Sequence, residues 1–317
     1  MRKALIVGTD YYKTISPLHG CVQDAYNMKS VLDRHSDGTK NFDTLLEIST
    51  GDSNFITRKE LKNQVETLFN DKSDIALFYF SGHGYIESTG GYLITSECSD
   101  GDDGLAMNDI LHIANESPAR NKIIILDCCH SGIAGNLTPK EDKAMISEGI
   151  TILTASSAEQ YAMEVNGSGV FTTLLVDALN GSAANLVGDI TPGSIYAHID
   201  QSLGPWEQRP IFKTNVTNFT TLRKVQPPIS LDDLKLIIKL FPKKGENFQL
   251  DPSFEPESEK PDEDNNEKFA ILQEYNRVNL VIPVDAPHMW HAAMNSKSCK
   301  LTVLGEHYWS LVKNERI

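Results

Sequence analysis

The sequence predicts an α/β domain built on a mostly parallel sheet, followed by a smaller C-terminal region. Short runs rich in β-branched residues alternate with segments of helical periodicity over the N-terminal two thirds of the chain. The 317 residues, of which 40% are hydrophobic, can form one large core and a smaller second one. We therefore expect a layered domain of six strands with helices packed against the sheet.

Six apolar runs predict the strands, and amphipathic segments between them predict the helices. The expected strands are residues 3–8, 42–48, 74–81, 122–128, 149–155 and 210–215. Helices are expected over residues 21–34, 57–69, from Gly169 onward and over about 193–203. The second helix begins with a capping box from Thr57 to Glu60. The apolar faces of these helices are expected to cover the sheet.

The character of the sequence changes after about residue 225. Ser230 and Asp233 can cap a short helix, and residues 251–268 are acidic, contain proline and have few large apolar side chains. Residues 269–317 are again hydrophobic and rich in aromatic residues and histidine. We therefore expect a main domain over 1–225, a helix and acidic linker over 226–268, and a small domain over 269–317.

Charge and cysteine content exclude several classes of partner. The formal net charge is −14, so nucleic acids and acidic membranes would be repelled, whereas basic peptides would be attracted. The apolar run after Met1 is too short for a secretory signal, and no run is long enough to span a bilayer. The 5 cysteines are odd in number and irregularly spaced, which is typical of free thiols in a reducing compartment. These features predict a cytoplasmic protein.

Two neighbouring strand candidates end in residues suited to nucleophilic catalysis. The third ends in "YFSGHGYIE", which contains His83, and the fourth ends in "LDCCHSG", which contains Cys128 and Cys129. If these strands are adjacent in a parallel sheet, His83 and one cysteine face each other across a cleft. An imidazole within hydrogen-bonding distance of a thiol can deprotonate it. The amide of Gly84 can then join that of Cys129 in binding an oxyanion.

Together these motifs resemble the caspase-like cysteine peptidases of the caspase-hemoglobinase fold, in particular the metacaspase and bacterial orthocaspase branch. The resemblance rests on "SGHG", "DCCHSG", "LHGCVQDAYNM", the Gly-Val-Phe-Thr segment that starts at Gly169, and "QRPIF" at 208–212. It extends from Met1 to about residue 215. It implies a caspase-like three-layer fold with a mostly parallel six-stranded sheet, to which a small C-terminal domain is added.

The resemblance assigns the nucleophile to Cys129 and the proton transfer to His83, while Cys128 occupies a position for a small buried residue. Strand geometry agrees, because adjacent side chains at a strand end point to opposite faces. His130 is an alternative base, but its ring is poorly placed to accept a proton from the neighbouring Cys129. A turn histidine and a pair of packing cysteines are the structural alternatives.

The resemblance also implies an acidic specificity pocket formed by Asp24 and Asp127, with Ser156 as a further substrate-binding residue. A carboxylate in a narrow pocket can accept two hydrogen bonds from a guanidinium, so arginine is preferred to lysine and aspartate is rejected. Without the resemblance, Asp127 could simply cap the next helix, and Asp24 could lie on a solvated helix face.

No cofactor or metal is required by the sequence. It contains no CxxC or HExxH spacing for zinc, no phosphate-binding loop and no dinucleotide fingerprint. Residues 96–104 are acidic enough to bind calcium, but they lack the ligand order of a known calcium loop, which favours a solvated turn. A calcium or nucleotide activator therefore stays an open alternative.

Control of activity is expected in the loop after the nucleophile, in the C-terminal region or in a partner. The first strand candidate begins at residue 3, which predicts the absence of an N-terminal prodomain. Lys140 and Lys143 are candidate self-processing sites, and an ordinary surface loop is the alternative. The C-terminal aromatic residues and histidines could bind a nucleotide with Lys297 and Lys300, or they could form a small core. This aromatic set comprises His288, Trp290, His291, His307, Tyr308 and Trp309.

The sequence thus predicts a cysteine endopeptidase that cleaves proteins or peptides after Arg, then Lys. By resemblance, it is a regulated effector of bacterial stress or antiviral defence, with a small-molecule or protein activator acting at the C-terminal region. No nucleic-acid or membrane partner is expected. The alternatives are a signal-binding scaffold with a catalytically idle peptidase fold, and an enzyme that uses the same thiol for another acyl transfer.

Overall fold

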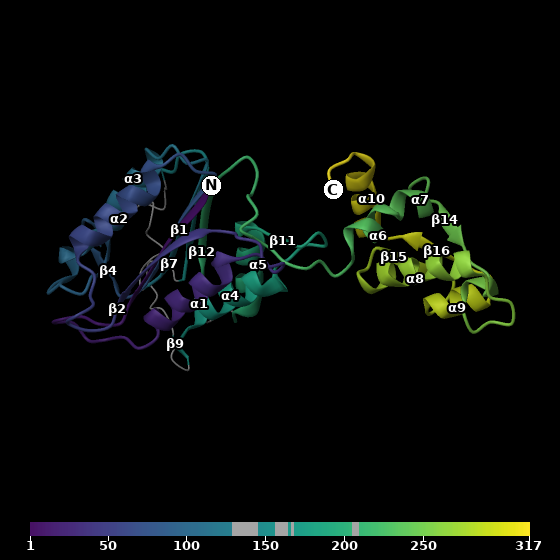
Figure 1. Ribbon diagram of the computed structural model, residues 1–317, viewed down its shortest axis with the longest axis horizontal. Coiled ribbons are helices and arrows are strands. Elements are labelled where there is room, and N and C mark those ends of the chain that lie inside the picture. Colours follow the sequence, from purple (N-terminus) through teal and green to yellow (C-terminus); the bar gives the residue numbers. More distant parts are fainter. Residues whose placement is uncertain (129–144, 156–163, 166–167, 205–208) are drawn as a thin grey trace. The chain divides into compact units, whose positions relative to one another are not determined.

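A computed structural model of the chain describes residues 1–128, 145–155, 164–165, 168–204 and 209–317 (Figure 1). The chain divides into two compact units. The first unit comprises Met1–Ala184 and Asp189–Val225. The second comprises Asn185–Gly188 and Gln226–Ile317, so a short segment from within the first part of the chain belongs to it.

The first unit is built on a six-stranded sheet with the strand order β12-β8-β7-β3-β1-β2. All neighbours are parallel except β12, which runs antiparallel to β8 at one edge. All the predicted strands are confirmed, and the mostly parallel sheet is confirmed with them. The strands are β1 (Arg2–Thr9), β2 (Asp43–Ser49), β3 (Ile75–Ser81), β7 (Asn121–Asp127), β8 (Ile150–Thr154) and β12 (Ile211–Asn215).

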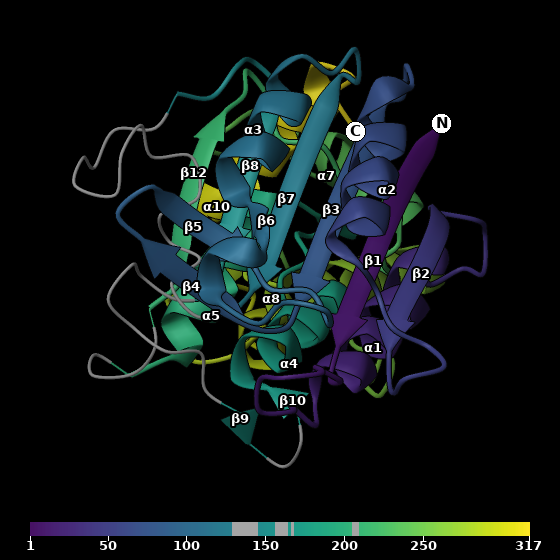
Figure 2. The same ribbon diagram turned by 90° about the vertical axis from the view of Figure 1, so that its left-hand side faces the viewer.

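Helices cover both faces of this sheet, so the predicted three-layer α/β fold is confirmed (Figure 2). On β3, Phe78 and Phe80 pack into the core below α2 and α3, whereas Leu77 and Tyr79 pack into the core below α1, α4 and α5. Because both faces are covered, β3 is buried along its whole length. The helices are α1 (Cys21–Asp33), α2 (Arg58–Asn70), α3 (Met107–Asn115), α4 (Val170–Asp177) and α5 (Pro192–Ser202).

Local sequence signals account for several of these elements. The capping box of α2 is present, since Thr57 accepts a hydrogen bond from the Glu60 amide and Glu60 accepts one from the Thr57 amide. Helix α3 was not predicted, although Met107, Ile110 and Leu111 follow helical spacing and are buried. A π-helical turn over Ala178–Ser182 continues α4.

Small antiparallel sheets at the margins of the first unit were also not predicted. The largest has the order β4-β5-β6 and begins directly after His83. Such short strands carry too few residues for a clear alternating pattern. They are β4 (Gly84–Glu87), β5 (Gly90–Leu93) and β6 (Leu105–Ala106), and the pairs β9 (Glu164–Val165) with β10 (Ser168–Gly169) and β11 (Asp189–Ile190) with β13 (Arg223–Lys224).

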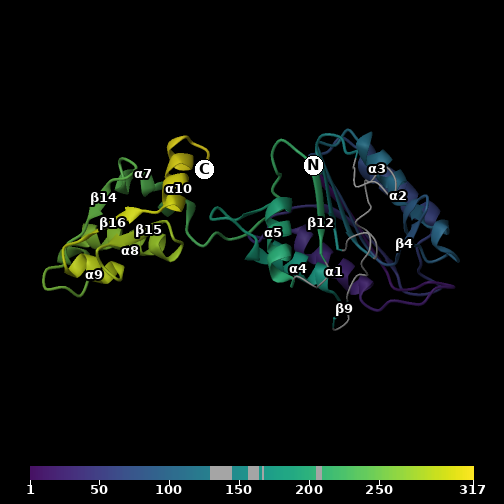
Figure 3. The same ribbon diagram turned by 180° about the vertical axis from the view of Figure 1, so that it is seen from behind.

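The second unit has its own antiparallel sheet and its own core (Figure 3). The sheet has the order β14-β16-β15, and its core contains Phe241, Phe269 and Tyr275, all buried. The strands are β14 (Asn247–Gln249), β15 (Val281–Val284) and β16 (Ser298–Leu301). The helices are α6 (Leu231–Lys235), α7 (Ile237–Leu240), α8 (Glu263–Arg277), α9 (Met289–Met294) and α10 (Val303–Lys313), and α6 is capped by Ser230 as predicted.

The acidic stretch 251–268 differs from the expected solvated linker. Asp251 caps a short 3-10 turn that buries Phe254, and Asp262 caps α8, which begins at Glu263. Asp262, Glu263 and Asp264, which contributed to the expectation of disorder, instead lie at the N-terminus of a helix, where negative charge is favourable. The core of the second unit therefore includes residues from both parts that the sequence analysis had separated.

We expect Gly8→Ala to destabilise the first unit. A Cβ on Gly8 would lie 2.4 Å from the carbonyl oxygen of Cys21 and 2.7 Å from the Cβ of Ala25, so α1 would be pushed away from β1. Overpacking of this kind costs about 1–3 kcal/mol. Urea unfolding followed by circular dichroism measures the loss.

Gly51→Ala is the matched control, because a Cβ there meets nothing within 4 Å. We expect its free energy of unfolding to stay within about 0.5 kcal/mol of the wild type. Equal stability of the two variants would contradict the close packing of α1 on β1.

Candidate active site

The residues suited to catalysis follow the carboxyl ends of neighbouring strands in the main sheet. In the parallel register, Ser81 at the end of β3 pairs with Asp127 at the end of β7 on one side and with Gly8 of β1 on the other. His83 follows β3, and the segment that contains Cys128 follows β7. The sequence analysis required these two strands to be adjacent, and β3 and β7 are neighbours in the sheet.

His83 is held by hydrogen bonds on its main chain and on its ring. Its Nε2 lies 2.9 Å from the carbonyl oxygen of Ser16. A carbonyl only accepts hydrogen bonds, so this contact assigns the hydrogen to Nε2, and in the neutral imidazole Nδ1 then carries the lone pair. The His83 amide donates to the Tyr12 hydroxyl at 2.8 Å. The ring is therefore oriented with Nδ1 as the nitrogen that can accept a proton.

The backbone amide of Gly84 is not used in the ladder between β4 and β5. Gly84 pairs with Leu93 in the antiparallel ladder of β4 and β5, and the carbonyl of the preceding His83 accepts a hydrogen bond from Ile94. In such a ladder the hydrogen-bonding direction alternates along the strand, so the amide of Gly84 is directed away from β5. The amide of Gly82, in contrast, donates to the carbonyl of Asp127.

Asp24 and Asp127 converge although they lie far apart in the sequence. They are 2% and 5% exposed, and both approach Gly169, which precedes the first residue of α4. The Gly169 amide donates to Asp24 Oδ2 at 3.0 Å. A Cβ on Gly169 would lie 2.4 Å from Asp127 Oδ2 and 3.1 Å from Asp24 Oδ2. Only a glycine permits this close approach of the backbone to two carboxylates.

A chain of hydroxyl groups supports Asp127 from inside the protein. The Thr172 hydroxyl donates to Asp127 Oδ2 at 2.7 Å and also lies 2.6 Å from the Tyr79 hydroxyl. Because the single hydroxyl hydrogen of Thr172 points to the carboxylate, Tyr79 must donate to Thr172. Burial, reinforced by Asp127 and Asp24, raises the pKa of Tyr79 well above its ordinary range, so the phenol remains a donor.

Two further cysteines near the carboxyl ends of these strands, Cys21 and Cys128, have structural roles. Cys128 is buried in the core below α2 and α3, which confirms its expected role as a small packing residue. Burial is the main cause that raises the pKa of the Cys21 thiol, and nearby Asp10, Asp127 and Asp24 raise it further. Cys21 is therefore a neutral thiol and a poor nucleophile.

Several predicted residues lie outside the described part of the chain. They are the nucleophile candidate Cys129, the alternative base His130, the substrate-binding candidate Ser156 and the self-processing candidates Lys140 and Lys143.

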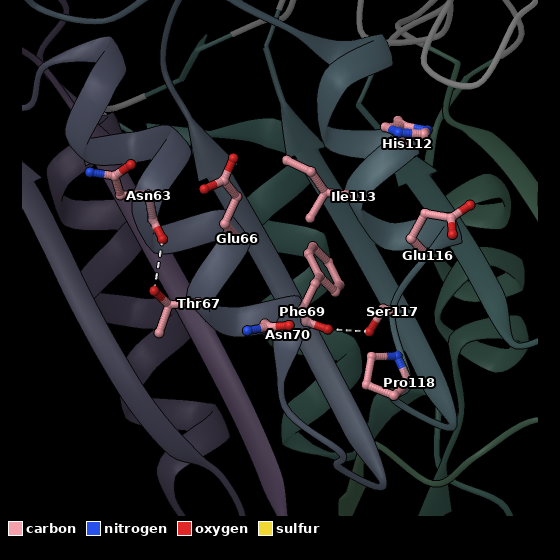
Figure 4. A pocket seen from close by; sticks show the side chains of 10 residues that line it. All are labelled: Asn63, Glu66, Thr67, Phe69, Asn70, His112, Ile113, Glu116, Ser117 and Pro118. Carbon is pink, nitrogen blue, oxygen red and sulfur yellow. Dashed lines mark hydrogen bonds between the residues drawn. The ribbon is translucent and has the colours of Figure 1, made fainter.

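A pocket of about 600 Å³ between α2 and α3 is remote from this chemistry (Figure 4). Its lining includes Glu66, His112 and Glu116. It also includes Phe69 and Pro118, which lie just before the starts of β3 and β7. The pocket thus lies toward the amino ends of the strands, whereas sites in parallel α/β sheets form at the carboxyl ends.

The acidic segment 96–104 forms a hydrogen-bonded turn. Asp103 Oδ2 accepts hydrogen bonds from the amides of Ser99 and Asp100 and from the Ser99 hydroxyl. Among the described residues, no group of three or more His, Cys, Asp or Glu side chains is arranged to hold a metal ion. None of the helices in the described ranges has the length and apolar character needed to cross a membrane.

The C-terminal aromatic residues divide between core and surface. Tyr308 is buried, and Trp309 packs against the same core while its Nε1 donates to the carbonyl of Phe241 at 2.7 Å. Trp290 is 51% exposed and lies edge-on to His291. This arrangement supports the small-core alternative for Tyr308 and Trp309.

Layers, strand order and strand ends together define a caspase-like fold. The caspase domain family, peptidase family C14, matches residues 1–223, so the chain belongs to this family. It contains a caspase-family, metacaspase-like cysteine peptidase domain, and the resemblance stated from the sequence motifs is confirmed.

The relatives with curated names are distant metacaspases. Metacaspase-1 of Scheffersomyces stipitis is 29% identical over 161 residues, which cover 43% of this chain and 37% of that protein. Metacaspase-1 of Plasmodium falciparum is 30% identical over 155 residues, covering 44% of this chain and 25% of that protein. Metacaspase-4 of Arabidopsis thaliana is 27% identical over 149 residues, which cover 41% of this chain and 34% of that protein. The chain thus matches well under half the length of these relatives.

Solved structures support the fold. Caspase-1 from Spodoptera frugiperda superposes with a TM-score of 0.51 at 14% identity, covering 71% of this chain and 91% of that one. A protein from Geobacter sulfurreducens superposes with a TM-score of 0.52 at 16% identity, covering 71% of this chain and all of that one.

We expect Thr172→Val to destabilise the first unit by about 1–3 kcal/mol, because the buried Asp127 and Tyr79 each lose a hydrogen-bond partner while the side-chain shape is kept. Thr67→Val on α2 is the control, since the Thr67 hydroxyl only donates to the carbonyl of Asn63 near the surface. Urea unfolding of both variants measures the difference. A Thr172→Val protein as stable as Thr67→Val would disprove the supporting role of this hydroxyl chain.

Proposed function

We propose that this protein is a cysteine endopeptidase that cleaves peptide bonds after arginine and, less efficiently, after lysine. The observation that carries the proposal is the parallel alignment of β3 and β7, whose ends lead into His83 and the Asp127–Cys129 segment. Membership of the caspase domain family supports the same chemistry. The catalytic pair is Cys129 and His83.

In the proposed reaction, His83 Nδ1 takes the Cys129 thiol proton, and the thiolate attacks the scissile carbonyl carbon. The carbonyl oxygen becomes an oxyanion that accepts hydrogen bonds from the amides of Gly84 and Cys129. His83 returns the proton to the leaving amine as the carbon–nitrogen bond breaks. A water molecule, deprotonated by His83, then hydrolyses the thioester and releases the free thiol.

The proposed specificity rests on Asp24 and Asp127, with Ser156 as a further contact to the substrate. Two buried carboxylates that converge at one point create a strongly negative site, in which a cationic side chain offsets the cost of their burial. A guanidinium can bridge both acids through its planar set of donors, whereas an ammonium acts as a point charge. An acidic side chain would be repelled.

We also infer a regulated peptidase, with the second unit as the sensing part and cleavage at Lys140 or Lys143 as a second means of control. The partners are proteins with basic cleavage sites and a small-molecule or protein activator, with calcium or a nucleotide as candidates. A place in bacterial stress or antiviral defence follows from the family resemblance.

We expect wild-type protein to cleave a fluorogenic peptide with arginine before the scissile bond, with lysine next and aspartate not cleaved. Cys129→Ala should lower the rate by roughly a thousandfold or more. Asp127→Asn should lower kcat/KM for the arginine peptide by roughly 10- to 100-fold, because a hydrogen bond to a charged group is lost. Assays with and without calcium and nucleotide mixtures test for an activator.

Asp109→Asn is the control for the pocket variant, since Asp109 lies on α3 and pairs only loosely with Lys62 at 3.6 Å. Its kcat/KM should equal that of the wild type. If the wild type cleaves no peptide and does not react with an arginine-based thiol probe, the idle scaffold replaces the peptidase proposal.

We expect purified wild-type protein to be cut after Lys140 or Lys143, and Lys140→Gln/Lys143→Gln to remain whole. The measurement is a denaturing gel followed by mass spectrometry of the fragments, with Cys129→Ala as the uncut reference. Full peptidase activity from a wild-type chain that stays intact would refute self-processing.

A further inference from the structure

Tyr12 connects the end of β1 to the residue that carries the imidazole. It lies in the segment between β1 and α1 and is 4% exposed. Its ring packs in a small cluster with Ile94 and Cys98. No part of the proposed chemistry uses this buried phenol, so its placement calls for another explanation.

The hydrogen bonds of the Tyr12 hydroxyl have a defined direction. The oxygen accepts from the His83 amide at 2.8 Å, and the hydroxyl lies 3.1 Å from the carbonyl of Thr9. A carbonyl cannot donate, so the phenol donates to Thr9. Burial raises the pKa of Tyr12 well above its ordinary range, which keeps this hydrogen in place. One hydroxyl thus joins the backbone ends of β1 and β3.

The same segment also orients the imidazole itself. The Tyr12 and His83 rings are in contact, with centroids 4.7 Å apart and planes inclined by 50°. Ser16, four residues further along, accepts from His83 Nε2 at 2.9 Å. The main chain, one ring face and one ring nitrogen of His83 are therefore all held by residues 12–16.

This segment is itself anchored to the surrounding protein. The Lys13 amide donates to the carbonyl of Ser96 at 2.9 Å, and the Thr14 hydroxyl donates to that of Cys98 at 2.7 Å. Gly82 fits the same arrangement, because a Cβ there would come within 2.9 Å of both the Tyr12 hydroxyl oxygen and Phe80 Cζ. The anchored segment 12–16 and the small residue Gly82 therefore both favour the hydrogen bond between Tyr12 and the His83 amide.

We propose that Tyr12 is a positioning residue, which holds His83 so that Nε2 meets the Ser16 carbonyl and Nδ1 remains the proton acceptor. The proposal rests on the proposed peptidase function for its kinetic consequence. Proton transfer requires the base within hydrogen-bonding distance of the thiol, and a displacement of about 1 Å can cost roughly a hundredfold in rate.

The first test compares Tyr12→Phe with Tyr11→Phe in the full-length chain. Tyr11 is the neighbouring tyrosine, but its hydroxyl contacts Asp52 in an exposed position. We expect Tyr12→Phe to lower kcat for the arginine peptide by about tenfold or more, with KM changed less than about twofold, because the hydrogen bonds of the hydroxyl to the His83 amide and to the Thr9 carbonyl are lost. Tyr11→Phe should match the wild type. Equal kcat in both variants would overturn the proposal.

The second test does not depend on peptidase activity. In protein with ¹⁵N-labelled histidine, the His83 signals, assigned with His83→Gln, should show one neutral form with its hydrogen on Nε2. Tyr12→Phe should give a mixture of both tautomers, and Tyr11→Phe should not. A role limited to stability would lower Tm and leave the tautomer and kcat unchanged, which would overturn the proposal.

These two tests separate the positioning role from the peptidase function. If the wild type cleaves nothing, the peptidase proposal fails, and the tautomer measurement still decides whether Tyr12 holds His83. If Tyr12→Phe does not fold, Gly82→Ala serves as the second variant, because its Cβ would come within 2.9 Å of the Tyr12 hydroxyl oxygen and of Phe80 Cζ while the phenol itself is kept. An unchanged Nε2 tautomer in that variant would also count against the proposal.

Discussion

The parallel register of β7, β3 and β1 is the constraint on which the candidate site depends. It aligns Gly8, Ser81 and Asp127 across neighbouring strands, so the segments that follow these residues all leave the sheet at the carboxyl ends of the strands. Covering helices on both faces keep these strands buried and prevent slippage, because a shift of one residue would exchange the two faces of every strand. The chemistry of His83 and of the segment after β7 is thus positioned by apolar packing.

Burial also determines which hydrogen-bond partners the polar groups at the carboxyl ends of these strands require. Asp24 and Asp127 lie in the interior, where each needs donors, and the Gly169 amide and the Tyr79–Thr172 pair supply them. The donors to the acids are Gly169, directly before α4, and Thr172 on α4, and Tyr79 of β3 supports Thr172 in turn, so the acids are tied to both the helix layer and the sheet. A cationic side chain that enters such a site meets carboxylates already oriented by the protein.

The second unit shows that acidic composition does not by itself mean disorder. The stretch 251–268 has few apolar residues, but Phe254 is buried, and the neighbouring helix α8 contributes Phe269 and Leu272 to the same core. Asp251, Asp262, Glu263 and Asp264 lie at helix N-termini, where backbone amides require acceptors. Local composition describes the solvent-facing side of such a segment and says little about the few side chains that anchor it.

The sequence by itself determined the six strands, the capped helix α2 and the pairing of a histidine end with a cysteine end, because these depend on local periodicity and on short motifs. It could not identify Tyr12 or Thr172, whose roles arise from hydrogen bonds to residues on other strands and helices. The family resemblance paired Asp24 with Asp127, and only the tertiary structure decided that both approach Gly169, that Ser16 faces His83 and that 251–268 is packed. Such contacts join residues distant in the chain, and no local pattern specifies which distant partner a side chain meets.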